Sequence, residues 1–469
     1  MTLLNDNYIL KNLKEQNEWW TSGTINSELA PAFRRKEYER VENVFFNSIR
    51  RFPVLSGPRR VGKSTIAFQI IDKLLKDGIK PERILFYTLD EFPNDGISIK
   101  DAIRIYQKYI YDQNDFYLFV DEVQKDDLWS SYLKKLYDLN KSVRALITGS
   151  ASTILENESG AGRFYTIKIP TMSFYEFCVM NNKQVKIPDI DVFKIHTLSL
   201  PEQTNIISTI GSLYKEMIKY FKIGGFPEYA SSDNYSYVSK LIRDQVITKA
   251  IKQDITSAFN IKNVEVISNI FTYFCYNTVS VINIDMLSKE LGIDRTTCSN
   301  YITALEKANL IYLSEQLEVG GKKPLKPKKR VYITDNGIKC AVTRNNNIET
   351  DDTEFGYAVE TMCYKHIRDY FDSIDSELYT VGYIRNNKDQ EIDIVIEENS
   401  FDIQYVEPKN RNNSIIKDTD GIVVLGMPNI PGYVITKNND DYGLSERKNT
   451  TLYRIPIVVF LYLIGKNKK

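Results

Sequence analysis

The stretch Gly57-Pro58-Arg59-Arg60-Val61-Gly62-Lys63-Ser64 decides the fold of the first part of this chain. It fits the pattern G-x-x-x-x-G-K-[ST], follows the apolar run 52–55 and precedes a helical run, 64–75. Its glycines let backbone N–H groups curl around phosphate oxygens, and the start of the helix adds partial positive charge. We therefore predict that the loop and Thr65 bind ATP, with Lys63 neutralising the β- and γ-phosphates and the Ser64 hydroxyl coordinating Mg²⁺. A chance glycine-rich turn is the alternative.

Two carboxylates follow the apolar run 117–120, at the point where that predicted strand ends. We expect Asp121 to hold the Mg²⁺, directly or through water, and Glu122 to polarise the attacking water as a general base. Adjacent carboxylates are costly unless a cation neutralises them, which weighs against Glu122 being only a surface residue. The next predicted strand ends at Thr148-Gly149-Ser150, where Thr148 and Ser150 either sense the γ-phosphate or cap a turn.

Short apolar runs alternate with helical patterns from about residue 34 to residue 177, which predicts an α/β fold with a parallel sheet. Each run is nearly free of charge, as a strand covered on both faces should be. The runs are Phe52-Pro53-Val54-Leu55, Ile84-Leu85-Phe86-Tyr87, Tyr117-Leu118-Phe119-Val120, Ala145-Leu146-Ile147 and Thr166-Ile167-Lys168-Ile169. Residues 178–255 are predicted to be helical instead, with a break at Gly224-Gly225-Phe226-Pro227.

The composition is that of an ordinary folded protein. A length of 469 residues predicts roughly two to four domains. Acidic and basic residues number 61 each, so no global field steers the chain to nucleic acid. Five Cys without zinc-ligand or disulfide spacing suit a reducing compartment. The N-terminus lacks a signal pattern and the longest apolar run, 455–464, is too short for a bilayer, so we expect a cytoplasmic protein with no membrane partner.

Five motifs occur in order along the chain: GPRRVGKST, FVDEVQKDDLW, ITGSAS, GAGRFYTIKIPTMSFYEF and GGFPEYA. Together they resemble the widespread prokaryotic P-loop ATPases of the AAA superfamily, the STAND-like or archaeal-type ATP-binding proteins. The resemblance implies an AAA-type core, a helical lid, a winged helix-turn-helix and an uncharacterised C-terminal domain that is similar to PD-(D/E)XK nucleases. It places Arg163 in the family's Gly-Arg motif. Such an Arg contacts phosphate in cis, or in a neighbouring subunit of a homo-oligomer, or forms a buried ion pair that holds the lid.

The predicted domain organisation follows these motifs. The fold class is α/β, with a P-loop core on a parallel sheet and a C-terminal α/β domain of the restriction-endonuclease-like kind. The predicted domains are an N-terminal segment at 1–30, the AAA-type core at 31–180, the helical lid at 181–258, the winged helix-turn-helix at 259–345 and the nuclease-like domain at 346–469. We expect the N-terminal segment to dock on the core through Trp19-Trp20, its large apolar pair.

A helix-turn-helix pattern occupies residues 284–308 and predicts DNA binding. Its second helix presents four polar side chains near its start, where base edges or phosphates are met: Arg295, Thr296, Thr297 and Asn300. Between two predicted wing strands, the run 322–330 holds six cations that would repel one another without a polyanion. The DNA contacts assigned to this run are Lys326, Lys328, Lys329 and Arg330. The alternative is a winged-helix protein-interaction module with a solvated basic loop.

The order Glu360, Asp393, Glu407-Pro408-Lys409 suits metal-dependent phosphodiester cleavage in the nuclease-like domain. Glu407 and Lys409 alternate on a predicted strand and therefore point to one face. We predict Glu360, Asp393 and Glu407 as Mg²⁺ ligands. Lys409 would then stabilise the charge that develops during cleavage. Pro408 removes a hydrogen-bond donor from this strand, so an intact but inactive relic is the alternative.

The sequence as a whole predicts an Mg²⁺-dependent ATPase whose nucleotide state switches DNA binding, with metal-dependent DNA cleavage by the C-terminal domain. The alternative comes from a different class of protein. It is an ATP-dependent protein-interaction regulator whose nuclease-like domain is inactive. Salt-sensitive DNA binding separates the two.

Overall fold

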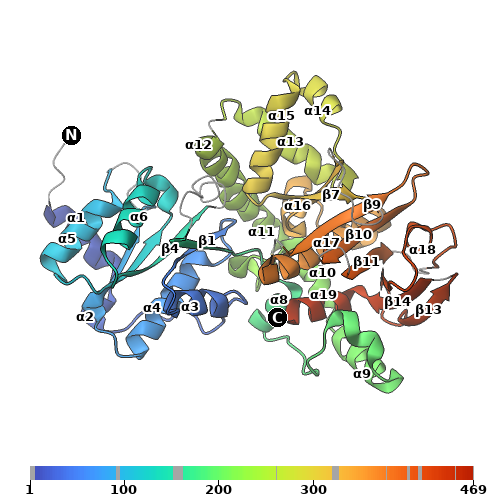
Figure 1. Cartoon of the computed structure of the whole chain (residues 1–469), viewed down its shortest axis with the longest axis horizontal. Coiled ribbons are helices and arrows are strands. Elements are labelled where there is room, and N and C mark those ends of the chain that lie inside the picture. Colours follow the sequence, from blue (N-terminus) through green and yellow to red (C-terminus); the bar gives the residue numbers. More distant parts are fainter. Residues whose placement is uncertain are drawn as a thin grey trace. The chain divides into compact units, whose positions relative to one another are not determined.

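The computed structural model describes residues 6–90, 96–150, 162–259, 261–318, 327–375, 378–398, 402–409, 415–448 and 450–467. The chain divides into two compact units, Met1–Pro170 with Ser257–Asn260 and Thr171–Thr256 with Ile261–Lys469. Both combine helices with a β-sheet (Figure 1), which confirms the predicted mixed α/β class. Over the described ranges, no helix has the length and apolarity needed to cross a membrane.

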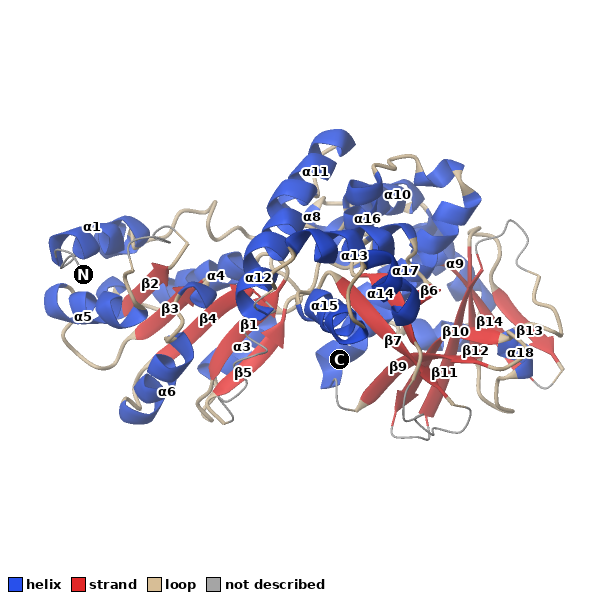
Figure 2. Ribbon diagram, turned by 90° about the horizontal axis from the view of Figure 1, so that it is seen from above, coloured by secondary structure: helices blue, strands red, loops and turns tan. Residues whose placement is uncertain are grey.

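A five-stranded parallel sheet with the order β2-β3-β4-β1-β5 forms the centre of the first unit. Its strands are β1 (Phe52–Gly57), β2 (Ile84–Thr88), β3 (Tyr117–Asp121), β4 (Arg144–Ser150) and β5 (Phe164–Lys168), the five predicted apolar runs. Figure 2 shows these strands side by side. Because all of them run in one direction, the C-terminal ends of β1, β3 and β4 meet at one edge of the sheet.

Helices cover both faces of this sheet because alternate strand residues on each face are apolar. On one face, Leu85 and Leu118 belong to a cluster that also contains Ile9 and Leu13 of α1. On the other, the ring of Phe45 packs on those of Tyr117 and Phe119. The helices are α1 (Asp6–Gln16), α2 (Trp19–Ser22), α3 (Tyr38–Phe46), α4 (Lys63–Lys76), α5 (Ile99–Tyr109) and α6 (Trp129–Leu139).

The N-terminal segment docks on β2 through the tryptophan pair. The indole N–H groups of Trp19 and Trp20 donate to the Ile84 carbonyl at 3.2 and 2.8 Å. Asn17 adds two hydrogen bonds to the backbone of Phe86, at 2.8 and 2.7 Å. The Trp19 side chain is fully buried, so burial of its large apolar area holds this segment on the sheet.

A nine-stranded sheet with the order β13-β14-β12-β11-β10-β9-β7-β8-β6 forms the second unit. Its strands are β6 (Ser280–Val281), β7 (Ile311–Leu317), β8 (Lys329–Ile333), β9 (Tyr379–Arg385), β10 (Glu391–Glu398), β11 (Asp402–Lys409), β12 (Gly432–Thr436), β13 (Gly443–Arg447) and β14 (Thr450–Pro456). The predicted wing strands β7 and β8 join the C-terminal strands, because β7 pairs in parallel with β9. The segments 259–345 and 346–469, predicted as separate domains, therefore share one sheet.

Helices of the second unit come before, between and after these strands. They are α8 (Phe174–Met180), α9 (Leu200–Gly211), α10 (Tyr214–Ile223), α11 (Tyr235–Leu241), α13 (Val264–Tyr276), α14 (Ile284–Leu291), α15 (Arg295–Lys307), α16 (Asn336–Thr343), α17 (Asp352–Asp375), α18 (Gly421–Val424) and α19 (Ile457–Lys466). Two π-helical turns, Ile242–Thr248 and Ala250–Ile255, lead from α11 to α12 (Thr256–Phe259). The apolar run at the end of the chain forms α19, whose residues Ile457–Gly465 are buried.

The Gly224-Gly225 pair is required by the backbone at the end of α10. The Gly225 N–H donates to Asp335 Oδ2 at 3.0 Å, and the Gly225 carbonyl accepts from the Met172 N–H at 2.7 Å. A Cβ on Gly224 would lie 2.2 Å from Asp335 Oδ1, and Gly224 has a φ of +75°. Larger residues would therefore clash with the acid that caps α16.

The buried residue His366 links α8 to α17 in the second unit. Its Nε2 accepts from the Phe174 N–H at 3.0 Å, and its Nδ1 lies 2.7 Å from the Met362 carbonyl. Burial is the main cause that lowers the pKa of His366 to about 3, and the neighbouring Lys365 ammonium acts in the same direction. The imidazole is therefore neutral in the folded protein at neutral pH.

We predict that His366 makes the second unit acid-sensitive. Its pKa is lower in the folded chain than the unfolded value of about 6.5. Its contribution to stability is therefore present above that value and lost as the pH falls toward 3. In denaturant titrations between about pH 7 and pH 4, His366→Gln should lose stability less steeply than wild type, by up to about 1.4 kcal/mol per pH unit. His196→Gln is the matched control: burial lowers the pKa of His196 as well, but by less, so this variant should change the slope less than His366→Gln does. An equal change of slope in the two variants would contradict the assignment.

Candidate nucleotide site and carboxylate cluster

The loop between β1 and α4 has the backbone shape of an anion cradle. Arg60 and Gly62 adopt left-handed conformations, with φ values of +66° and +94°. Right- and left-handed residues in succession turn neighbouring N–H groups toward a common point, where an anion can bind. Helix α4 begins at Lys63 and is 14 residues long, so its N-terminus directs its dipole into the same place.

Two contacts fix this loop against the sheet. The Ile169 N–H donates to the Ser56 carbonyl at 2.7 Å, and a Cβ on Gly57 would lie 2.1 Å from the Ile169 carbonyl oxygen. Arg35 is buried and donates to the carbonyls of Val61, at 2.5 Å, and Pro170, at 2.9 Å. The sequence motif accounts for Gly57, whereas the role of Arg35 was not predicted because it precedes the motif by more than 20 residues in a segment without pattern.

Lys63 and Ser64 occupy the first turn of α4. The Lys63 ammonium donates to the carbonyls of Gly57 and Pro58 at 3.0 and 2.8 Å, so it lies over the loop. The Ser64 hydroxyl lies 2.9 and 3.1 Å from the two carboxylate oxygens of Asp121. Thr65 follows on α4 and is half-buried. The structure thus brings the loop and the predicted carboxylate together across the intervening strand β4.

The predicted acids follow each other at the end of β3. Burial and the neighbouring Glu122 raise the pKa of Asp121 to about 6, while hydrogen bonds from Thr148 and Ser64 and the charge of Lys63 lower it. The Thr148 hydroxyl donates to Asp121 Oδ1 and lies 3.4 Å from the Glu122 N–H. Glu122 has a φ of +56°, a strained conformation of the kind that gathers at functional sites.

Gln124 was not among the predicted site residues. Its side-chain NH₂ group donates to Glu122 Oε2, and its side-chain oxygen Oε1 accepts from the Ser150 N–H at 3.2 Å. Gln124 therefore connects the candidate base to the end of β4. It lies in the motif FVDEVQKDDLW, two residues after Glu122, which is the signal that could have found it.

The donor set at this edge fits Mg²⁺. A hydroxyl and a carboxylate, the oxygen ligands that Mg²⁺ prefers, lie next to each other at Ser64 and Asp121. Burial, and then the neighbouring Glu122, raise the pKa of Asp121, and a cation bound beside this carboxylate would favour its charged form. The remaining positions of an octahedral ion are left to water and phosphate oxygens.

Arg163 lies near the N-terminal ends of the strands, whereas the loop follows the C-terminal end of β1. Its carbonyl accepts from the Phe52 N–H at 2.9 Å, at the N-terminal end of β1, and the loop is five strand residues away, roughly 17 Å. Its guanidinium forms an exposed ion pair with Asp138 on α6, 2.9 Å long. A phosphate contact within the same chain is incompatible with this position, and so is a buried ion pair. A contact in a neighbouring subunit stays a prediction.

Four of the eight predicted DNA contacts lie on the first turns of α15. Arg295, Thr296 and Asn300 are exposed. Thr297 is half-buried, and its hydroxyl and backbone N–H both bind the capping carboxylate of Asp294, at 2.6 and 2.9 Å. Arg295 forms an ion pair of 3.0 Å with Asp285 of α14. Lys328, which precedes β8, and Lys329, its first residue, are exposed. The predicted contact Lys326 lies outside the described residues.

Arg330 is not part of this exposed basic surface, which corrects the prediction. Its side chain is 3% exposed, and its guanidinium pairs with Glu391 at 2.6 Å, Glu360 at 3.1 Å and Asp393 at 3.4 Å. The guanidinium also lies 4.6 Å from the centre of the Tyr383 ring. The last residue of the predicted basic run therefore faces the predicted metal ligands instead of a nucleic acid.

The predicted metal ligands do come together in one cluster. Glu407 pairs with Lys409 at 2.8 Å and accepts from the Asp393 N–H at 3.3 Å. Burial raises the pKa of Glu360 to about 7 and raises those of Asp393 and Glu407. Even so, the described residues contain no group of three His, Cys, Asp or Glu side chains arranged to hold a metal ion. With Arg330 between them, these carboxylates do not fit the predicted Mg²⁺.

The strands explain how the cluster forms. The pairing of β9 with β10 shifts register between Ile392 and Val395, a bulge that contains Asp393. Bulges redirect side chains in this way. The antiparallel pairing of β10 with β11 ends at Val406, so Pro408 pairs only with β12 and removes no donor from the β10 ladder.

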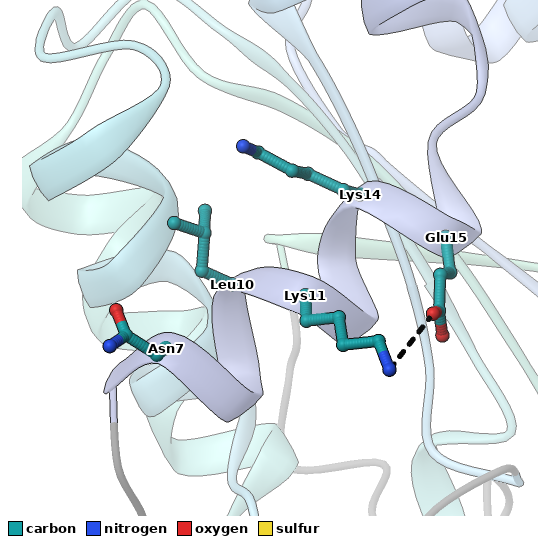
Figure 3. Close-up of a pocket in the computed structure, with 5 residues that line it drawn as sticks. All are labelled: Asn7, Leu10, Lys11, Lys14 and Glu15. Atoms are coloured by element: carbon teal, nitrogen blue, oxygen red, sulfur yellow. Dashed lines mark ion pairs between the residues drawn. The ribbon is translucent and has the colours of Figure 1, made fainter.

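A surface hollow of 380 Å³ lies along α1 (Figure 3). Its lining residues all belong to that one helix: Asn7, Leu10, Lys11, Lys14 and Glu15. Lys11 and Glu15 form an exposed ion pair of 3.8 Å, which contributes little to stability. The hollow brings together no catalytic set, so it carries no functional assignment.

Family models match three segments of the chain. Residues 50–178 match an AAA domain, residues 214–349 match a domain of unknown function (DUF8612), and residues 355–458 match another domain of unknown function (DUF4143). The first match covers β1 to β5 and the loop described above. The sheet, the loop and this match define the first unit as an AAA-type P-loop domain.

Two relatives are uncharacterised proteins. One, from Haemophilus influenzae, is 27% identical over 296 residues, which are 61% of this chain and 68% of that protein. The other, from Methanocaldococcus jannaschii, is 27% identical over 409 residues, or 84% and 83%. Among solved structures, the Thermotoga maritima RuvB Holliday junction branch migration motor is similar at 15% identity, over 66% of this chain and 89% of that one, with a TM-score of 0.25. A TM-score this low carries no argument about function.

We predict that Gly57 cannot be enlarged without moving the loop. Gly57→Ala places its Cβ against the Ile169 carbonyl, and relief of that contact should cost roughly 2–3 kcal/mol of stability and weaken nucleotide binding. Gly78→Ala, with no atom within 4 Å of its Cβ, is the control and should leave nucleotide affinity unchanged. Denaturant unfolding and calorimetric titration measure both effects. Equal nucleotide affinity in the two variants would contradict the packing role of Gly57.

Proposed function

We propose that this protein binds ATP with Mg²⁺ at the loop of residues 57–64 and hydrolyses it. The observation that carries the proposal is the contact of the Ser64 hydroxyl with the Asp121 carboxylate, with Glu122 as the next residue. It places a hydroxyl and a carboxylate suited to Mg²⁺ beside a second carboxylate suited to a general base. The match of residues 50–178 to an AAA domain supports the same reading.

Each residue has a defined task in this proposal. Lys63, which donates to two loop carbonyls, turns to the β- and γ-phosphates and neutralises them. Ser64 and Asp121 hold Mg²⁺, which supplies charge neutralisation to the phosphates. Glu122 accepts a proton from the attacking water. Gln124 orients Glu122, because its amide donates to that carboxylate.

The matched pair Lys63→Ala and Glu122→Gln tests this proposal. Lys63→Ala removes the counter-charge of the phosphates and should weaken ATP binding by at least about tenfold. Glu122→Gln should keep ATP affinity but slow hydrolysis by about 10² to 10⁴, because it removes the base and leaves the loop intact. Calorimetric titration measures binding and phosphate release measures turnover.

Lys76→Ala is the control for this pair, because Lys76 lies at the exposed end of the same helix and pairs with Asp72. It should change neither quantity. Normal turnover by the Glu122→Gln protein would show that the base is another residue. Normal ATP affinity of the Lys63→Ala protein would show that the phosphates do not bind at this loop.

We further propose that nucleotide state controls binding of DNA by α15 and the neighbouring cations. Support comes from a groove of 570 Å³ between α14, α15 and the approach to β8. Arg295, Lys328 and Lys329 line it, so three cations lie where a phosphate backbone would pass. DNA cleavage is not part of this proposal, because the carboxylate cluster does not fit a metal ion.

A second candidate function is binding of a protein segment in this same groove. Its lining also includes Ile284, Ile302 and Leu313, side chains that suit an apolar anchor better than a phosphate backbone. Asp285, paired with Arg295, adds a negative charge that would repel DNA. The salt dependence of binding decides between the two.

Replacement of Lys328 and Lys329 together by Ala is expected to weaken duplex DNA binding and flatten its salt dependence. Each lost phosphate contact lowers the slope of log affinity against log salt by about 0.9. Fluorescence anisotropy at several salt concentrations gives this slope. The control replaces Lys240 and Lys252, which are exposed outside the groove, and should leave the slope unchanged. An equal slope in all three proteins would favour the protein-binding function.

A further inference from the structure

The carboxylate cluster of the second unit contains its own cation. Four carboxylates from α17, β10 and β11 converge: Glu360, Glu391, Asp393 and Glu407. The Arg330 guanidinium pairs with the first three and Lys409 with the fourth. A charged carboxylate that is largely removed from water needs a cation or hydrogen bonds nearby, and here a protein cation reaches every one of the four.

Arg330 lies at the position that a shared metal ion would take. Its Nη1 lies 3.1 Å from Glu360 Oε1 and 3.4 Å from Asp393 Oδ1, so one nitrogen lies between the two predicted ligands. An Mg²⁺ ion bound by both oxygens would stand about 2.1 Å from each. The nitrogen and the ion therefore compete for the same space, and their like charges exclude each other.

The surroundings of Arg330 hold it in place. Its backbone lies inside the sheet, where Arg330 of β8 pairs with Ser314 of β7 on one side and with Val281 of β6 on the other. The guanidinium carbon lies over the Tyr383 ring, 4.6 Å from its centre, which is a cation–π contact. Tyr332, on the same strand, donates to Glu360 Oε1 at 2.9 Å. These contacts fix the guanidinium among the carboxylates.

We propose that Arg330 is a built-in cation that takes the place of a divalent metal ion, so that the cluster joins β8 to α17 and β10 and does not bind Mg²⁺ or cleave DNA. Arg330, the last residue of the basic run, is thus buried and pairs with carboxylates, while Lys328 and Lys329 are exposed. The proposal concerns the second unit alone and does not depend on ATP hydrolysis.

Metal binding by the full chain tests the proposal directly. Free Mn²⁺ is measured by electron paramagnetic resonance during titration of nucleotide-free wild type and of a double variant, Asp393→Asn with Glu407→Gln. Because Arg330 excludes the ion, both proteins should bind the same number of Mn²⁺ ions, and neither should cut DNA in Mg²⁺ or Mn²⁺. One additional Mn²⁺ on wild type, or DNA cleavage that the double variant loses, would overturn the proposal.

Arg330→Met gives the converse test, because Met keeps much of the side-chain volume but removes the charge. In buffer without divalent ions this variant should melt lower than wild type. Mn²⁺ at roughly 100-fold excess over its Kd should then raise the Tm by about 5 °C, since ligand binding to the folded state stabilises it. The control is Lys329→Met, which removes an exposed cation next to Arg330 in the chain. Mn²⁺ should not raise the Tm of this control. A folded Arg330→Met protein that Mn²⁺ does not stabilise would show that Arg330 occupies no cation position.

Discussion

The hydrogen bond between Ser64 and Asp121 links the helix that follows β1 to the end of β3, a strand that is not a neighbour of β1. β1 and β3 are separated by β4, and all three end at the same edge because the sheet is parallel. Apolar side chains on both faces of the sheet hold these ends in register. The loop after β1 and a strand that ends in carboxylates can therefore meet only if the whole sheet forms. The chemistry of the first unit thus depends on long-range strand pairing more than on any local preference.

The described part of this sheet was predictable from the sequence, because each strand is a short apolar run and each run precedes a helical pattern. The loop was predictable as well, since its glycines, lysine and serine have spacing that few other structures require. Gln124 lies in a quoted motif, two residues after Glu122, and was overlooked, whereas Arg35 was not predictable in this way. The role of Arg35 comes from where a long side chain reaches in three dimensions, and neither charge nor spacing encodes that reach. The same reason explains why the position of Arg163 was not predicted, since its motif does not say at which end of the strands the residue lies.

Arg330 shows a different limit of charge patterns. Six cations in nine residues indicate an exposed basic segment, and Lys328 and Lys329 agree with that interpretation. Strand alternation nevertheless turns the side chain of the last cation into the protein, toward carboxylates that lie 30 to 63 residues later in the chain. A pattern of charges along the sequence cannot tell a solvated cation from a buried one that pairs with acids. Only the pairing of β8 with β7 and β6 decides this.

The parallel pairing of β7 with β9 has a consequence for how this chain can be divided. Family models separate the segments 214–349 and 355–458, yet the hydrogen bonds between Glu315–Leu317 and Gly382–Ile384 cross that boundary. A fragment that ended between the two segments would leave β7 with an open edge, and exposed strand edges recruit other chains. Gene fusions and deletions that respect the sequence boundary would therefore tend toward aggregation, whereas exchange of the entire nine-stranded sheet would leave its edges paired as they are.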